Sequence, residues 1–174
     1  MRIEISEFVE GARQAVGLTV IIDVFRAFSL ECYAIDAGAS RIIATATPGE
    51  AFRLREIYRG SLLAGERNEM KIQGFDFGNS PTEIIKSDLT GRTLIHTTTA
   101  GTAGLVSAVN ADMIITGSLV NASAVAGFIR ERKPGRVSLV AMGYRACISA
   151  EEDLVCARYI KSLAEGRNEN FDEE

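Results

Sequence analysis

The sequence predicts an α/β fold, in which a single three-layer α/β/α domain surrounds a mostly parallel or mixed central sheet. Short apolar runs rich in β-branched residues alternate with longer segments of helical period, which is the pattern of strands connected by helices. The length of 174 residues suits one domain, and 47% hydrophobic with 24% charged residues is an ordinary globular composition. We expect residues 1–164 to form this domain. The segment 165–174 has almost no apolar content and is expected to be a frayed tail.

Six apolar runs have the length and composition of buried strands. They are Leu18–Val24, Arg41–Thr45, Leu62–Ala64, Arg92–Thr97, Met113–Thr116 and Val137–Ala141. Six helices are predicted between and after them: about Ala27–Ala37, Gly49–Tyr58, Pro81–Lys86, Gly101–Val109, Asn121–Glu131 and Glu151–Ala164. Pro48 followed by Glu50 is a helix-start signal, and Gly38 and Gly60 stand where helices would stop.

Charge and composition exclude several classes of protein. Lys and Arg total 19 against 23 Asp and Glu, a net charge of −4 that argues against a nucleic-acid or anionic-membrane partner. The three cysteines, an odd number without C-x-x-C spacing, suggest neither a disulfide framework nor a zinc site, so we expect reduced thiols in a cytoplasmic protein. The first residues do not resemble a signal peptide, and no stretch approaches 18 apolar residues. One histidine, His96, excludes mechanisms that need two imidazoles.

Asp23 and Arg26 follow the first predicted strand. Because ligands of open α/β sheets bind beyond the carboxyl ends of the strands, Asp23 is a candidate Mg²⁺ ligand or nucleophile. The alternative is a helix N-cap or an ion pair with Arg26. Position alone does not separate the two interpretations.

The fourth strand leads into a threonine-rich turn, LIHTTTAGTAG. Thr98, Thr99, Gly101 and Thr102 would offer hydroxyls and free amides at the start of a helix, which together can bind an anion such as phosphate. The Gly-Lys-Ser/Thr element of a nucleotide-binding loop is missing. The alternative is a hydrogen-bonded helix cap, a common role of threonine.

The connection 65–81 is longer than most within a compact domain, which favours a functional loop. It supplies Glu66, Arg67, Asp76, Asn79 and Ser80, a combination that suits a metal and an anionic substrate. A solvated surface loop is the alternative, although the phenylalanines that flank Asp76 argue that the loop packs on the core. For His96, inside an apolar strand, a structural role is favoured because no nucleophile–base pair forms nearby in sequence.

Taken together, these segments resemble the 2-phosphosulfolactate phosphatase family of Mg²⁺-dependent acid phosphatases, which acts in coenzyme M biosynthesis. The matching blocks are VIIDVFRAFS at 20–29, LLAGERNEMKIQGFDFGNSP at 62–81, TTTAGT at 97–102, GSLVNASAVA at 117–126 and EEDLVCA at 151–157. The resemblance covers the chain from about Thr19 to Ile160. It departs at Ala100, where family members usually have Asn, and in the length after the last block, where they usually carry several tens more residues.

The resemblance implies hydrolysis of a phosphate monoester of a small 2-hydroxy acid, that is, 2-phosphosulfolactate to sulfolactate and phosphate, with Mg²⁺ as cofactor in a cytoplasmic homodimer. Asp23, Arg26, Glu66 and Arg67 match the family's motifs, and from their chemistry we expect them to form the catalytic set. For substrate and phosphate binding the resemblance adds Asn121 and Ser123 to Asn79, Ser80, Thr98, Thr99, Gly101 and Thr102. Asp23, Glu66, Asp76 and Asp153 are expected to converge on the metal.

Two alternatives stay open from the sequence. One is a related phosphatase with another small phosphorylated hydroxy acid as substrate, and the other is a shortened, non-catalytic anion-binding homologue. For an enzyme, the attacking group is either an aspartate carboxylate, with Asp23 the first choice, or a water molecule.

Overall fold

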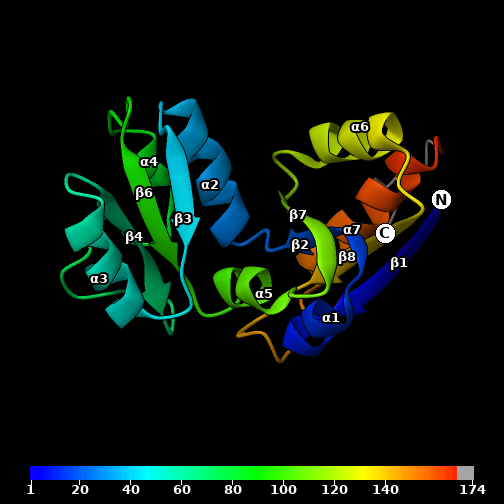
Figure 1. Cartoon of the computed structure of the whole chain (residues 1–174), viewed down its shortest axis with the longest axis horizontal. Coiled ribbons are helices and arrows are strands. Elements are labelled where there is room, and N and C mark those ends of the chain that lie inside the picture. The colour runs from blue at the N-terminus through cyan, green and yellow to red at the C-terminus, as the bar shows by residue number, and fades with distance from the viewer. Residues whose placement is uncertain (168–174) are drawn as a thin grey trace.

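The computed structural model describes residues 1–167 and shows two four-stranded sheets with helices around them (Figure 1). The first sheet contains β1 (Arg2–Glu7), β8 (Arg136–Ala141), β2 (Gly17–Ile22) and β7 (Ala111–Gly117), in that spatial order. The second sheet contains β3 (Arg41–Ala44), β6 (Thr93–Thr97), β4 (Leu62–Arg67) and β5 (Met70–Lys71). All neighbouring pairs are parallel except the short β4–β5 hairpin. The predicted α/β class is confirmed, with the strands divided between two sheets where one central sheet was expected.

Seven helices accompany the strands in the described part of the chain. They are α1 (Phe8–Gln14), α2 (Ala27–Asp36), α3 (Pro48–Ile57), α4 (Pro81–Ile84), α5 (Gly101–Ser107), α6 (Ala122–Arg132) and α7 (Glu151–Ala164). All six predicted strands and all six predicted helices are present with small shifts of their ends. The sequence analysis missed β1, α1 and β5, the first and last of which lie at sheet edges.

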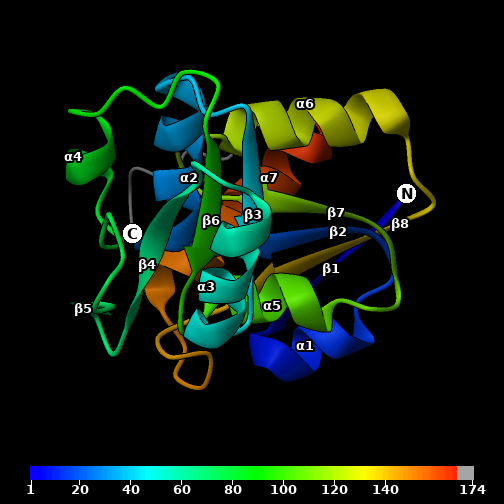
Figure 2. The ribbon, with the colours of Figure 1, turned by 60° about the vertical axis from the view of Figure 1, so that its left-hand side comes forward.

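The division into two sheets follows from how the chain crosses between them. Helix α2 carries the chain from β2 to the second sheet, and α5 carries it back from β6 to β7 (Figures 1 and 2). An apolar run in the sequence indicates that a strand is buried but not which strand lies beside it. The pairing of β2 with β7 and β8 was therefore beyond the reach of the sequence pattern.

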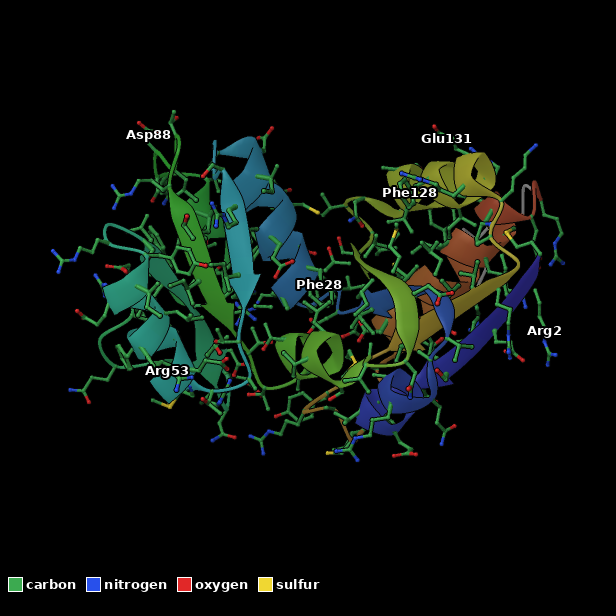
Figure 3. All side chains as sticks on the ribbon, in the orientation of Figure 1. Arg2, Phe28, Arg53, Asp88, Phe128 and Glu131 are labelled. Atoms are coloured by element: carbon green, nitrogen blue, oxygen red, sulfur yellow. The ribbon has the colours of Figure 1, made fainter. Side chains whose placement is uncertain are left out.

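Each sheet is covered by helices on both faces, so the predicted helix–sheet–helix layering is present at each sheet. On the first sheet, α6 and α7 pack on one face, while residues of α1, α2 and α5 or its flanks pack on the other. On the second sheet, α2 and α4 cover one face and α3 the other. Helix α2 thus contributes to both halves, and its fully buried Phe28 lies near the middle of the molecule (Figure 3).

Among the described helices, none combines the length and the apolar content that a membrane crossing requires. Of the predicted frayed tail, residues 168–174 lie outside the described part of the chain.

The two central strands of the second sheet, β4 and β6, approach each other very closely at Gly65, and this contact gives a test of the fold. The φ of Gly65 is +150°, and a Cβ atom there would lie 1.9 Å from the carbonyl oxygen of Thr97. We expect Gly65→Ala to destabilise the protein by about 3 kcal/mol or more, because β4 and β6 must separate. Gly49→Ala is the matched control: nothing lies within 4 Å of its Cβ position, so its effect should stay within about 1 kcal/mol. Urea denaturation midpoints measure both, and equal midpoints would contradict this close packing.

Candidate functional site

A pocket lies where the carboxyl ends of strands from both sheets meet. Loops after β2, β4, β6 and β8 supply most of its wall, which is the usual position of ligand sites in α/β folds. The lining residues are Asp23, Phe25, Arg26, Glu66, Asn68, Glu69, Asn79, Thr99, Ala100, Gly143, Tyr144 and Arg145. The pocket therefore brings together the residues that the sequence placed after the first strand, in the connection 65–81 and in the threonine-rich turn.

Asp23 is a buried carboxylate at the end of β2, with 7% of its surface exposed. Its Oδ1 accepts a hydrogen bond from the amide of Ala27 at 3.0 Å, and the amide of Gly101 also contributes a hydrogen bond. Burial, together with the neighbouring Asp153, raises the pKa of Asp23 to about 7, while the two amides act in the opposite direction. The N-cap of α2 is Arg26, so Asp23 is not the capping residue itself; its carboxylate accepts from the first amide of the helix and also lines the pocket.

Glu66, at the end of β4, is held by the turn that follows β6. Its Oε1 accepts a hydrogen bond from the amide of Thr99 at 2.6 Å, and its Oε2 accepts from the Thr99 hydroxyl at 3.1 Å and from the amide of Glu69 at 2.8 Å. These contacts fix the carboxylate against two loops of the second sheet. Only 8% of the Glu66 surface is exposed.

The predicted anion-binding turn therefore binds carboxylates of the protein itself. The amide of Thr99 serves Glu66 and the amide of Gly101 serves Asp23. Thr98 and Thr102 pair with each other, because the amide of each donates to the hydroxyl of the other at 2.8 and 3.1 Å. The turn has the donors that the sequence indicated, and within residues 1–167 these donors are engaged by internal acceptors.

Asp153, in the first turn of α7, links two loops of the first sheet. Its Oδ1 accepts from the amide of Val24 at 2.7 Å and its Oδ2 from the amide of Gly143 at 2.8 Å. Burial raises the pKa of Asp153 to about 6, against the opposing effect of the two amides. Both oxygens are thus occupied by backbone, so Asp153 supports the pocket wall and does not line it.

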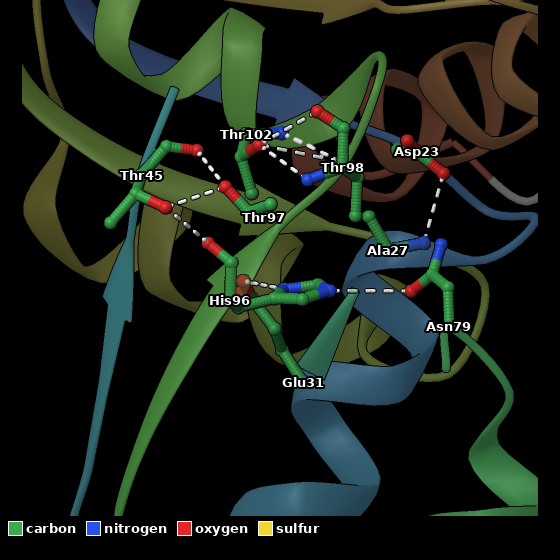
Figure 4. A network of polar contacts seen from close by, with 9 residues as sticks. All are labelled: Asp23, Ala27, Glu31, Thr45, Asn79, His96, Thr97, Thr98 and Thr102. Carbon is green, nitrogen blue, oxygen red and sulfur yellow. Dashed lines mark hydrogen bonds and ion pairs between the residues drawn. The ribbon is translucent and has the colours of Figure 1, made fainter. Parts of the chain in front are cut away.

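A buried polar chain lies behind the pocket. His96, on β6, is completely buried; its Nδ1 lies 2.9 Å from Glu31 Oε1 and its Nε2 lies 3.2 Å from Asn79 Oδ1 (Figure 4). On the opposite side of β6, Thr97 donates to the carbonyl of Thr45 at 2.7 Å. The predicted structural placement of His96 is correct. The histidine also contacts Asn79, which lines the pocket.

Two arginines and a tyrosine face the opening. Arg26 and Arg145 are exposed residues of the pocket wall, and the Arg145 guanidinium lies 5.2 Å from the ring centre of Tyr144. The Tyr144 hydroxyl donates to Glu69 on the β4–β5 hairpin, a contact that joins the two halves of the molecule across the pocket. This positive edge can attract an anionic ligand.

Besides Asp153 and the turn residues Thr98, Gly101 and Thr102, five predicted site residues do not line the pocket. The Arg67 guanidinium donates to the carbonyls of Glu66 and Ala46 at 2.9 and 2.7 Å. Asp76 accepts from the amide of Leu63 at 2.8 Å, near the start of β4 and thus at the other end of the strand from Glu66. The remaining three residues, which stand beside or within helix starts, are Ser80, Asn121 and Ser123.

Asp76 and Asn121 have clear local roles. Asp76 also pairs with Arg55 at 3.4 Å, so it anchors the loop on α3 as the flanking phenylalanines suggested, but not near the predicted metal. Asn121 accepts from the amide of Ser118 at 2.8 Å and donates to the carbonyl of Thr116 at 3.0 Å. Both side chains satisfy backbone groups of their own loops.

The sequence analysis missed Asn68, Glu69, Tyr144 and Arg145. The strand-end rule could have found the last two, because they come three and four residues after the predicted strand Val137–Ala141. That rule was applied to the first and fourth strands only. Asn68 and Glu69 have φ values of 52° and 67°, which identify a tight turn that no local glycine signals.

The donor chemistry of the pocket fits Mg²⁺, although the predicted cluster of four carboxylates is not formed. Within residues 1–167, no group of three or more His, Cys, Asp or Glu side chains has a metal-binding arrangement. Mg²⁺, however, usually keeps several waters and needs one or two carboxylates together with oxygens of a phosphate substrate. Asp23 and Glu66 line the same pocket and meet that smaller requirement.

Comparisons with known proteins identify similar chains of one family. A family described as 2-phosphosulpholactate phosphatase matches residues 4–174. The chain is 39% identical over 164 residues to a probable 2-phosphosulfolactate phosphatase of Carboxydothermus hydrogenoformans, covering 94% of this chain and 67% of the relative. Proteins of the same description from Bacillus subtilis and Thermotoga petrophila are 33% and 38% identical, with 87% and 83% of this chain and 65% and 61% of theirs covered. The chain thus spans about two thirds of the length of these relatives.

The double contact of Asp153 gives a test of the pocket wall. We expect Asp153→Ala to destabilise the protein by about 2 to 4 kcal/mol, because two buried amides lose their acceptors. The neighbouring Glu152→Ala is the control and should change stability by no more than about 0.5 kcal/mol. Thermal and urea unfolding measure both variants. An Asp153→Ala protein as stable as the control would show that these amides find other acceptors.

Proposed function

The chain belongs to the 2-phosphosulpholactate phosphatase family, and from this membership we propose that it hydrolyses a phosphate monoester of a small 2-hydroxy acid, 2-phosphosulfolactate, with Mg²⁺ as cofactor. The proposal is carried by one observation. The buried carboxylates of Asp23 and Glu66 line one pocket with the arginines Arg26 and Arg145. Oxygen ligands beside paired guanidinium groups suit a metal ion and a multiply charged organic phosphate.

Asp23 and Glu66 are the residues that would hold Mg²⁺ in this proposal. When bound, the ion supplies charge neutralisation at the phosphoryl oxygens and activation of a nucleophile. The hydrogen bonds of both carboxylates to backbone amides fix their positions before substrate binds, which reduces the reorganisation needed during the reaction.

The arginines account for the anionic groups of the substrate. A 2-phosphosulfolactate molecule carries a carboxylate and a sulfonate beside the phosphate, so one guanidinium alone would leave acid groups unpaired. Arg26 and Arg145 project from loops after β2 and β8 and can each form two parallel hydrogen bonds to an oxyanion. The side-chain amide of Asn79 adds a neutral hydrogen-bonding group beside Asp23.

The hydrolysis breaks the bond between phosphorus and the ester oxygen of the substrate. The hydroxy acid then leaves after its oxygen has taken up a proton. The attacking group is either the Asp23 carboxylate, followed by hydrolysis of the acyl phosphate, or a water molecule whose proton Asp23 accepts. In both cases Asp23 needs to be ionised next to the phosphorus. Binding of a cation in the pocket would favour that form.

We also propose a homodimer in the cytoplasm, with residues 1–164 acting as one catalytic unit. The unit is supported by the pocket, whose wall comes from both sheets. Strand β7 lies at an edge of the first sheet with Met113 and Ile114 exposed, and such an edge favours association with a second copy. The cysteines Cys32, Cys147 and Cys156 are free thiols, in keeping with a reducing compartment.

The first test measures phosphate release from 2-phosphosulfolactate with Mg²⁺ and with EDTA. We expect activity with Mg²⁺, loss of it with EDTA, and its return when Mg²⁺ is added back. Asp23→Asn should abolish turnover in a folded protein, because it removes the charge that holds the ion or attacks phosphorus. Equal rates with Mg²⁺ and EDTA, or full activity of Asp23→Asn, would rule out the proposed mechanism. A panel of other phosphorylated hydroxy acids separates a different substrate from loss of catalysis.

The second test concerns Arg145. We expect Arg145→Ala to lower kcat/KM roughly 10- to 100-fold, since a charge-assisted hydrogen bond contributes about 1.5–3 kcal/mol and its exposure reduces that value. Arg53→Ala, on the exposed face of α3, is the matched control and should leave kcat/KM unchanged (Figure 3). Steady-state kinetics at fixed ionic strength measure both. Similar values for the two variants would remove Arg145 from substrate binding.

A further inference from the structure

The chain's single histidine connects a buried carboxylate to a pocket residue. Glu31 lies on α2 with 8% of its surface exposed, and its Oε1 is 2.9 Å from Nδ1 of His96. The other ring nitrogen, Nε2, is 3.2 Å from Oδ1 of Asn79, and Asn79 lines the pocket together with Asp23. Glu31 and His96 do not themselves line the pocket. They can act on a ligand through Asn79, and the charge of His96 also acts through space on Asp23, which the Asn79→Ala background below controls for.

The atoms on each side of the ring determine its protonation. When Glu31 is a carboxylate and Oδ1 of Asn79 faces Nε2, both neighbours of the ring only accept hydrogen bonds, so both ring nitrogens donate and the imidazole carries a positive charge that Glu31 compensates. Such a pairing is what burial of either charge requires, because an isolated charge in the interior is strongly unfavourable.

The protonation of His96 and the orientation of the Asn79 amide are coupled, so each state of the ring goes with one orientation of the amide. With Oδ1 held by Nε2–H, the NH2 group of Asn79 is on the side away from His96, toward Asp23 (Figure 4). Among the described residues 1–167, the Asn79 side chain forms one hydrogen bond, and its partner is His96. Its NH2 group is thus available in the pocket. A neutral His96 would instead accept from Asn79 and turn the amide oxygen to the pocket.

We propose that Glu31 and His96 are positioning residues that fix the Asn79 amide so that its NH2 group donates to an oxyanion of the substrate beside Asp23. The inference rests on the proposed function, because a phosphorylated acid offers acceptors and no donors at that place. The opposite amide orientation would direct an oxygen toward a phosphoryl oxygen and repel it. The buried ion pair therefore acts at the site by selecting one of two amide orientations.

The variant that tests this is Glu31→Gln, which keeps the size and the acceptor for Nδ1 but removes the charge. We expect the ring to become neutral and Asn79 to reverse its amide. The value of kcat should fall roughly 10²-fold, as is typical when one donor to the reacting charge is lost. Asp36→Asn, an exposed change of the same kind on the same helix, is the matched control and should keep full activity.

A double-mutant cycle separates positioning from general stability. If Glu31 acts through Asn79, Glu31→Gln should lower kcat in the wild-type background but have little further effect when Asn79 is already Ala. Equal fold-losses in both backgrounds would contradict the inference, as would wild-type kinetics of a folded Glu31→Gln protein.

The protonation state is measured without substrate. In ¹⁵N-labelled wild-type protein, the one imidazole should give N–H signals from both ring nitrogens, and Glu31→Gln should give one. A single N–H signal in the wild type would overturn the inference. If the wild type releases no phosphate, the proposed function fails. The double-mutant cycle is then repeated with the affinity for inorganic phosphate, measured by calorimetry, in place of kcat. Equal phosphate affinities of wild type and Glu31→Gln, at equal stability, would then overturn the positioning role independently.

Discussion

Hydrogen bonds from backbone amides to buried carboxylates hold the pocket together. Asp153 accepts two amides that belong to the loops after β2 and β8, and Glu66 accepts amides from the loops after β4 and β6. A buried carboxylate without such partners costs several kcal/mol, and so does each amide that loses its acceptor. The loops cannot move apart without incurring both costs at once. The carboxylates therefore determine the shape of the pocket as well as its charge.

These contacts hold the loops of each sheet rigidly in the site. Fewer polar contacts join the loops of the first sheet to those of the second. Glu66 joins loops of the second sheet, whereas Asp153 joins loops of the first. Across the opening, Tyr144 contacts Glu69 from an exposed position, where a hydrogen bond contributes little to stability. The relative placement of the halves depends mainly on α2 and α5, the two helices through which the chain crosses between the sheets. Substrate binding across the opening would add contacts between the two halves.

The sequence predicted the residues whose role follows from their place at a strand end. Asp23, Glu66 and Thr99 of the threonine-rich turn line the pocket because the carboxyl ends of parallel strands meet there. Asp76 could not be placed, since a polar residue in a long loop can face either end of the neighbouring strand, and here it caps Leu63 at the far end of β4. Arg145 was missed although the same strand-end rule applied. The division of the strands into two sheets also depends on long-range pairing that no local pattern carries.

Charge balance in the pocket favours a divalent cation together with an anionic substrate. Three acids, Asp23, Glu66 and Glu69, line the wall against two arginines, so the wall alone has an excess of negative charge when all these groups are ionised. A phosphate dianion entering this wall would be repelled by Asp23, whose raised pKa shows how unfavourable its own charge already is there. A dication held by Asp23 and Glu66 would reverse the sign of that interaction. The overall charge of −4, which on its own argues against an anionic partner, is thus compatible with one as soon as the acids of the pocket hold a metal ion.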